Sequence, residues 1–252
     1  MEIARELKRK IASGRVTTGV LATFHLWTGL VEILRNAGFD YVIADLEHGA
    51  FDDALIRDVC AIGRMIGFPV IVRTISADYP FVRKAIDLGP CGLMFPCVED
   101  SATLDRARDA IYLPPRGKRR PGGAGNAWVK NYDASTWKTE VEDDFIVLPQ
   151  IESLQGLANA EAIAGHELTT AIAVGPYDLS AELGLCWKPD HPAFREAIER
   201  IRRAGQSAGK NMWMIGDGSA SLRQGFTFLC IGEATSMFSS SLIEANRKVK
   251  PA

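Results

Sequence analysis

Several signals that would identify other classes of protein are missing from this 252-residue sequence. Its five cysteines include no CxxC pair and stand mostly in apolar runs, which disfavours a zinc site or a disulfide framework and indicates reduced thiols. No GxGxxG motif follows the first apolar run, and no GxSxG elbow stands at the end of an apolar run. A dinucleotide-binding sheet and a serine hydrolase are therefore disfavoured.

The chain also lacks a strong charge and a long apolar stretch. A formal net charge of −2 gives no indication of nucleic acid or of an anionic membrane surface as a partner. No apolar run is long enough to span a bilayer, and residues 1–14 form a charged amphipathic pattern rather than a signal peptide. A cytoplasmic protein is the expectation.

What is present is a regular alternation of short apolar runs with helical patterns. The runs cover residues 16–21, 41–44, 70–72, 92–95, 145–148, 170–174, 212–215 and 228–231. Helical patterns cover about residues 27–37, 53–66, 79–88, 101–111, 154–164, 191–208, 219–224 and 236–248. Eight strand–helix units in about 250 residues predict a TIM (β/α)8 barrel as a single domain over 1–252, with an open doubly wound sheet as the alternative.

Ionisable residues gather directly after these runs. Active sites of TIM barrels lie at the carboxyl ends of the strands, so these residues are the candidates for catalysis. They are Asp45, Glu47 and His48 after the second run, Arg73 after the third, Gln150 and Glu152 after the fifth, and Asp178 after the sixth.

Glu152 and Asp178 follow consecutive strands of the predicted barrel. Because neighbouring parallel strands end at the same rim, the two carboxylates are expected to converge as hard oxygen ligands for Mg²⁺ or Mn²⁺. The alternative is that each carboxylate caps the helix that follows it.

Asp45, His48 and Arg73 form the second candidate group. A carboxylate three residues before an imidazole is able to orient it as a general base, although Glu47 is an alternative partner for His48. Arg73 suits a carboxylate or a developing oxyanion, or else an ion pair with Asp45 or Glu152. No lysine ends a predicted strand, which disfavours a Schiff-base aldolase.

Residues 112–137 are rich in glycine, proline and cations and show no sustained periodicity. A loop of this length in a compact domain is typically a lid or a binding loop. A surface excursion or a subunit contact is the alternative.

Several segments together resemble the HpcH/HpaI family of metal-dependent pyruvate aldolases. They are FDYVIADLEHGAFD (39–52), VIVR (70–73), AIDLGPCGLMFPCVED (85–100), YLPPRGKR (112–119), PQIES (149–153) and VGPYDLS (174–180). The resemblance implies a barrel of the phosphoenolpyruvate/pyruvate-domain type, with the last helix exchanged between subunits of a hexamer. It also implies a class II aldolase that adds a pyruvate-type enolate reversibly to an aldehyde.

The resemblance further implies a role for each matching residue. Glu152 and Asp178 would hold a divalent metal (Mg, Mn or Co), with no organic cofactor. His48, oriented by Asp45, would be the general base, and Arg73 would stabilise the enolate oxygen. The remaining substrate-binding positions would be Gln150, the turn formed by Gly175, Pro176, Tyr177 and Asp178, and Asp87 reaching a neighbouring subunit's site.

Some positions depart from the usual family pattern, namely Thr74, Pro90 and Tyr177. They leave the implied metal–pyruvate centre intact but bear on the identity of the aldehyde. Oxaloacetate decarboxylation or a related carbon–carbon lyase or synthase is an alternative activity, and a non-catalytic anion-binding barrel is the non-enzymatic one.

Overall fold

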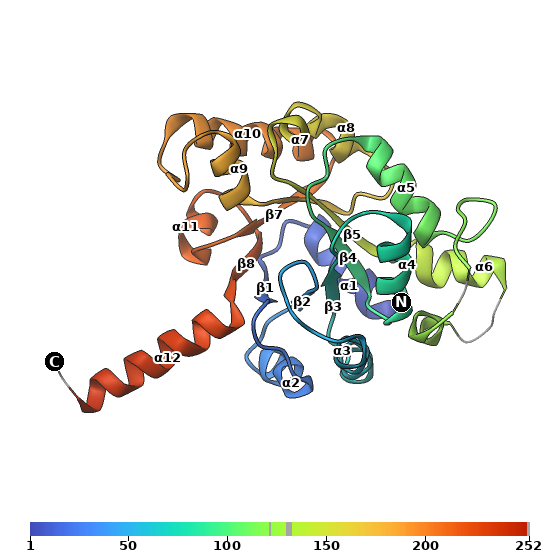
Figure 1. Cartoon of the computed structure of the whole chain (residues 1–252), viewed down its shortest axis with the longest axis horizontal. Coiled ribbons are helices and arrows are strands. Elements are labelled where there is room, and N and C mark those ends of the chain that lie inside the picture. The colour runs from blue at the N-terminus through green and yellow to red at the C-terminus, as the bar shows by residue number, and fades with distance from the viewer. Residues whose placement is uncertain (121, 130–132, 251–252) are drawn as a thin grey trace.

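The computed structural model describes residues 1–120, 122–129 and 133–250. Eight parallel strands form a closed barrel in which each strand pairs with its neighbours in chain order and β8 pairs with β1 (Figure 1). The strands are β1 (Thr17–Ala22), β2 (Tyr41–Asp45), β3 (Val70–Arg73), β4 (Gly92–Phe95), β5 (Ile146–Ile151), β6 (Ala171–Val174), β7 (Asn211–Ile215) and β8 (Phe228–Glu233). The predicted TIM barrel is confirmed.

Most helices pack around the barrel, whereas the last one runs away from it (Figure 1). The helices are α1 (Glu2–Ala12), α2 (Thr28–Asn36), α3 (Asp53–Ile66), α4 (Tyr79–Asp87), α5 (Ser101–Ile111), η1 (Ala124–Trp128), α6 (Ala134–Trp137), η2 (Lys138–Glu142), α7 (Leu154–Ala158), α8 (Ala160–Gly165), α9 (Pro176–Glu182), α10 (Pro192–Ser207), α11 (Gly218–Arg223) and α12 (Ala234–Val249).

Side chains fill the interior of the barrel. The Tyr41 ring occupies the space beside Gly19, where a Cβ atom would approach the ring to 2.2 Å. Its hydroxyl donates to the Leu229 carbonyl at 2.8 Å and accepts from the Trp213 indole at 2.8 Å. Since this buried hydroxyl is satisfied and the strands are buried on both faces, the barrel is a packed core that holds the strand ends rigidly.

The predicted helices agree closely with the structure at 53–66 and 101–111, but the one predicted over 154–164 is wrong as a single element. It divides into α7 and α8 at Asn159, whose φ and ψ of −102° and 14° are not helical. The Asn159 backbone amide still donates to the Gln155 carbonyl at 3.1 Å, and its side-chain amide donates to the Glu99 carbonyl at 2.8 Å, so the junction carries a tertiary hydrogen bond that the local pattern does not contain.

The segment 112–137 is only partly the loop that the sequence suggested. It contains η1 and α6, and residues 121 and 130–132 within it lie outside the described part of the chain. The sequence pattern predicted a turn at Gly175 and Pro176 but not α9, which begins there.

Two further features bear on later arguments. Helix α12 runs away from the barrel, and no described residue of it is buried (Figure 1). Cys60, Cys91 and Cys230 are buried and unpaired, whereas Cys97 and Cys186 are exposed. Within the described ranges, no helix has both the length and the apolar character needed to cross a membrane.

Candidate functional site

The centre of the candidate site is an ion pair between neighbouring strand ends. Asp45 ends β2 and Arg73 ends β3, and the two residues are paired in register across the sheet. The Arg73 guanidinium donates to both Asp45 oxygens, from Nε at 2.8 Å and from Nη2 at 2.7 Å. This bidentate geometry fixes the orientation of Arg73 at the carboxyl end of the barrel.

Asp45 accepts three further hydrogen bonds. The Thr23 hydroxyl donates to it at 2.8 Å, and the backbone amides of Glu47 and His48 donate at 3.0 and 3.4 Å. Burial alone would raise the pKa of Asp45, but the hydrogen bonds and charge of Arg73, with those from Thr23 and the Glu47 amide, hold that pKa below its ordinary value. Asp45 is therefore a buried, ionised anchor.

The predicted contact between the Asp45 carboxylate and the His48 imidazole is wrong in this structure. Asp45 contacts His48 only through the backbone amide, because Arg73 and Thr23 already occupy its oxygens. The imidazole Nε2 lies 3.7 Å from Glu47 Oε2, and the His48 side chain is 61% exposed. Glu47, the alternative partner in the sequence, is thus the carboxylate beside the candidate base.

Glu47 also contacts Arg73, whose Nη1 lies 3.1 Å from Glu47 Oε2. Burial raises the pKa of Glu47 above its ordinary value, and the charges of Asp45 and Asp178 act in the same direction, against Arg73 and His48. The same Arg73 guanidinium therefore joins the fully buried Asp45 to the half-buried Glu47.

Glu152, just after β5, is buried and faces the same rim. It accepts from the Cys97 amide at 2.6 Å and from the Gln150 side-chain amide. Burial, together with the charges of Glu47 and Asp178, raises the pKa of Glu152 to about 7, against the hydrogen bonds from Cys97 and Gln150, which lower it. Cys97 was not indicated by the sequence as part of the site.

Gly175 lies directly against this carboxylate. A Cβ atom at Gly175 would stand 2.0 Å from Glu152 Oε2 and 2.7 Å from Gln150 Nε2. The next residues, Pro176, Tyr177 and Asp178, begin α9, and the Asp178 side chain lies within electrostatic range of both Glu152 and Glu47. The absence of a side chain at Gly175 is what lets β5 and β6 bring these groups together.

The donor set fits a divalent cation. The carboxylates of Asp45, Glu47, Glu152 and Asp178 lie near one another, and Arg73 is the arginine that contacts Asp45 and Glu47 in the described part of the chain, so negative charge is in excess. The buried Gln150 Oε1 atom accepts no hydrogen bond, and Glu47 Oε2 has ion-pair contacts with Arg73 and His48 but no hydrogen bond. Among the described residues, no three His, Cys, Asp or Glu side chains form a metal-binding group by themselves. The predicted metal site, however, needs only the carboxylates of Glu152 and Asp178 and leaves the remaining coordination positions for water and substrate.

Asp87, the remaining predicted binding residue, is not brought to this site in its own subunit. It ends α4, five residues before the start of β4, and therefore lies toward the amino ends of the strands. Arg119 Nη2 lies 3.5 Å from its carboxylate. A role for Asp87 in a neighbouring subunit's site stays a prediction.

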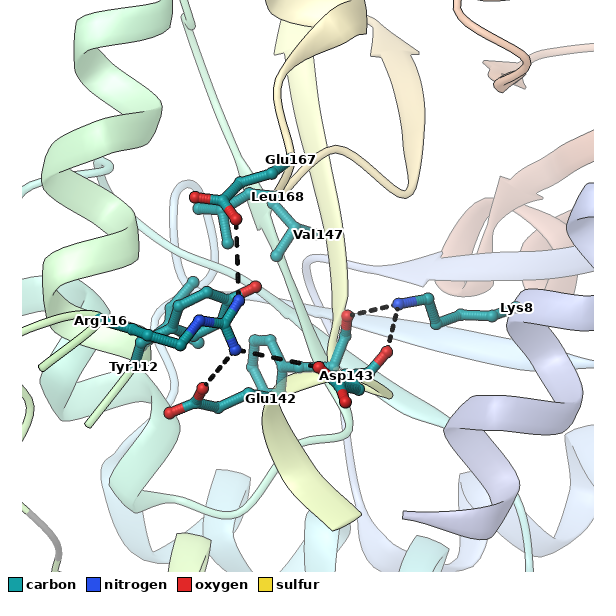
Figure 2. A pocket seen from close by; sticks show the side chains of 10 residues that line it. Lys8, Tyr112, Arg116, Glu142, Asp143, Val147, Glu167 and Leu168 are labelled. Carbon is teal, nitrogen blue, oxygen red and sulfur yellow. Dashed lines mark hydrogen bonds and ion pairs between the residues drawn. The ribbon is translucent and has the colours of Figure 1, made fainter. Parts of the chain in front are cut away.

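A pocket of about 190 Å³ lies at the amino end of the barrel (Figure 2). Arg116 there stacks over the Tyr112 ring at 4.1 Å and pairs with Glu142 at 2.8 Å, and Lys8 donates to the carbonyls of Asp143 and Phe145. Burial lowers the pKa of Lys8. Its two hydrogen bonds to the carbonyls connect α1 to the start of β5. This pocket is therefore a structural ion cluster, at the end of the barrel opposite to the candidate site.

Comparison with known proteins agrees with this geometry. A profile of the HpcH/HpaI aldolase/citrate lyase family matches residues 28–239. A hydroxypyruvate/pyruvate aldolase from Pseudomonas aeruginosa is 33% identical, over 96% of this chain and 92% of the relative. A 4-hydroxy-2-oxo-heptane-1,7-dioate aldolase from Salmonella arizonae is 32% identical over 84% of each chain. The crystal structure of an HpcH/HpaI aldolase from Desulfitobacterium hafniense DCB-2 superposes with a TM-score of 0.88 and 25% identity, covering 98% of this chain and 97% of the other.

The barrel, the anionic site at its carboxyl end and these likenesses define a class II aldolase. The chain belongs to the HpcH/HpaI aldolase/citrate lyase family, as its sequence motifs predicted.

Proposed function

We propose that the protein uses a divalent metal, held by Glu152 and Asp178, to form the enolate of pyruvate or a similar 2-oxo acid and add it reversibly to an aldehyde. The observation that carries this proposal is Glu152, which is buried, has a pKa of about 7 and lies in the field of two further carboxylates. A cation would relieve that repulsion, and the named relatives act on pyruvate, hydroxypyruvate or 4-hydroxy-2-oxo acids.

When bound, a divalent cation acts as a Lewis acid that stabilises negative charge on a carbonyl oxygen. Arg73 provides a second, permanent positive charge, because Asp45 and Glu47 hold the guanidinium and raise its pKa above its ordinary value against the effect of burial. We assign to Arg73 the stabilisation of the enolate oxygen, and to Gln150 and the turn from Gly175 to Asp178 the binding of the 2-oxo acid.

His48 is the proposed base. Its imidazole is exposed at the mouth of the barrel and beside Glu47, which suits a group that takes a proton from the methyl carbon and returns one to the new alkoxide. Asp45 fixes the backbone of the turn that carries His48 rather than the ring itself.

The test is exchange of the pyruvate methyl protons with D₂O, followed by NMR, with Mg²⁺, Mn²⁺ and Co²⁺ in turn. The wild-type protein is expected to catalyse exchange. Glu152→Gln and Asp178→Asn should each lower the rate by at least about 100-fold, because each removes one ionised ligand. Glu161→Gln, at an exposed carboxylate on α8, is the matched control. Absence of exchange with all three metals would refute the proposal.

The preferred metal, the assembly and the compartment belong to the same proposal. Mg²⁺, Mn²⁺ and Co²⁺ are the proposed metals because the ligands are hard carboxylate oxygens. A homo-hexamer that exchanges α12 between subunits is supported by the exposed apolar residues of that helix. A cytoplasmic location is supported by the five unpaired cysteines.

A further inference from the structure

An aromatic cluster stands beside the proposed metal ligand Asp178. Tyr177 at the start of α9 stacks on Trp187 with ring centroids 4.1 Å apart and planes inclined by 30°. Trp187 also makes an edge-to-face ring contact with Phe194 on α10, with centroids 6.0 Å apart and an interplanar angle of 74°. The indole is therefore fixed between two rings, yet Trp187 remains 42% exposed.

The backbone at Trp187 is strained. Cys186 and Trp187 have φ values of 39° and 65°, in the left-handed region that non-glycine residues rarely adopt. The Trp187 amide donates to the Ser180 hydroxyl at 2.7 Å, which holds this conformation. Strain of this kind is concentrated at ligand-binding positions, and a partly exposed tryptophan in place of glycine points to a use for the side chain.

Trp187 forms part of the wall of a groove of about 850 Å³. The groove lies among α9, α10, α11 and the end of β7, which are grouped on one side of the barrel (Figure 1). Its apolar wall includes Pro176, Trp187, Phe194, Met214, Ile215 and Phe226. Pro176 directly follows Gly175, which lies against Glu152, so one end of the groove reaches the rim that carries the proposed metal site. Its volume suits a small organic molecule.

Four of the five charged side chains that line the groove form ion pairs, and the fifth, Asp217, accepts from the Ala220 amide at 3.0 Å as the cap of α11. Arg195 lies 2.5 Å from Asp190, and Arg202 lies 2.8 Å from Glu199. An anionic ligand would have to displace Asp190 or Glu199 from these arginines. A neutral, flat, apolar group would instead pack against the aromatic wall without breaking an ion pair.

We infer that this groove receives the organic body of the aldehyde acceptor and selects a neutral aromatic one, with Trp187 as the contacting wall and Tyr177 as the residue that positions the indole. This inference rests on the proposed aldolase function and specifies its acceptor. Sequence alone singled out Tyr177 but not its partner.

The test compares benzaldehyde with glycolaldehyde as acceptors for pyruvate. The ratio of their kcat/KM values is expected to favour benzaldehyde in the wild type. It should fall about fivefold in Trp187→Gly, mainly through KM for benzaldehyde, since an aromatic contact contributes about 1 kcal/mol. Glycine accepts the left-handed backbone, so this variant is expected to fold.

Tyr177 is tested by a conservative pair. Tyr177→Phe keeps the stacked ring and should keep the wild-type ratio, whereas Tyr177→Ala should lower it as Trp187→Gly does. Phe81→Ala, at a 44% exposed aromatic residue on α4, is the control and should leave the ratio unchanged. An unchanged ratio in Trp187→Gly, or equal losses in Tyr177→Phe and Tyr177→Ala, would overturn the inference.

A binding measurement separates this inference from the proposed function. Benzyl alcohol, an unreactive analogue of benzaldehyde, should bind about fivefold more weakly to Trp187→Gly than to the wild type, measured by calorimetry. If pyruvate exchange is absent but this difference is present, only the aldolase proposal fails. If exchange is present but benzyl alcohol binds both proteins equally, only the acceptor site fails.

Discussion

At the residue scale, the site depends on how one arginine is shared by two carboxylates. Arg73 is bidentate to the fully buried Asp45 and also contacts Glu47, which is partly open to solvent. Asp45 is held by Thr23 and two backbone amides and acts as the rigid support for Arg73. Glu47 has fewer hydrogen bonds, so its carboxylate is the one that can move when a ligand binds. The two carboxylates therefore differ in role although they are only two residues apart.

Asp45→Asn is expected to destabilise the protein in a pH-dependent way. At pH 7 it should lower the free energy of unfolding by about 3 kcal/mol, since it leaves the buried Arg73 charge without its partner. The pKa of Asp45 in the folded state lies below its ordinary value, so the wild-type advantage is complete above about pH 4 and is lost as the pH falls through the folded-state pKa.

Urea unfolding of wild type and Asp45→Asn at pH 7, 5 and 3.5 measures this effect. The difference between the two proteins should be the same at pH 7 and 5 and smaller at pH 3.5. A difference that grows toward low pH would contradict the assignment of Asp45 as an ionised anchor.

Gly175→Ala is expected to disable the site while leaving the barrel folded. The new methyl group would meet Glu152 Oε2 at 2.0 Å, so the carboxylate has to move. A displacement of about 1 Å lowers kcat/KM by about 100-fold. Circular dichroism and the rate of pyruvate proton exchange check the two parts. The same substitution at Gly165, where a Cβ atom meets nothing within 4 Å, should leave exchange at the wild-type rate.

At the scale of elements, short connections bring the strand ends into one site. The amide of Cys97, after β4, donates to Glu152 after β5, and the end of β6 passes the same carboxylate at Gly175. Asn159 performs a similar task outside the barrel, where it joins the α7–α8 junction to the segment after β4 through the Glu99 carbonyl. The helices therefore support the catalytic rim through individual hydrogen bonds as well as through packing.

Asn159→Ala should lower the free energy of unfolding by about 1 kcal/mol, because it leaves the Glu99 carbonyl without its donor. For a protein of this size the melting temperature should fall by about 2–4 °C in calorimetry. Gln155→Ala, at an exposed position on α7, is the control. A melting temperature equal to that of wild type would show that the α7–α8 junction does not depend on this bond.

At the scale of the whole molecule, α12 differs from the other helices because it does not pack along the barrel. It projects from the barrel after β8, and Phe238, Leu242, Ile243 and Val249 on it are at least 50% exposed (Figure 1). An isolated subunit would leave these apolar side chains in water, which is unfavourable. Their burial in an assembly is therefore the expected outcome.

Leu242→Asp is expected to reduce the assembly to smaller species, because it places a charge in the apolar contact. Light scattering after size exclusion measures the mass, for which the proposal requires a wild-type hexamer. Asn246→Asp adds the same charge at another exposed position of α12 and should keep the wild-type mass. A monomeric wild-type protein would contradict the exchange of α12.

The sequence by itself determined the barrel and the rim where chemistry takes place. Strand and helix periodicities are local properties, so eight apolar runs with helices between them were enough to predict the fold. The position of Asp45, Arg73, Glu152 and Asp178 after their strands followed from the same alternation, because parallel strands in a barrel end at one rim.

Only the tertiary structure decided which of these side chains meet. The sequence placed Asp45 against the His48 ring, but Arg73 and Thr23 from neighbouring strands occupy its oxygens, and Glu47 stands beside the imidazole instead. It gave no signal for the strained Trp187 against Tyr177, nor for the close approach of Gly175 to Glu152. The physical reason is that a hydrogen bond or a ring contact depends on atoms that the fold brings together from distant segments, and no local pattern of residues contains that geometry.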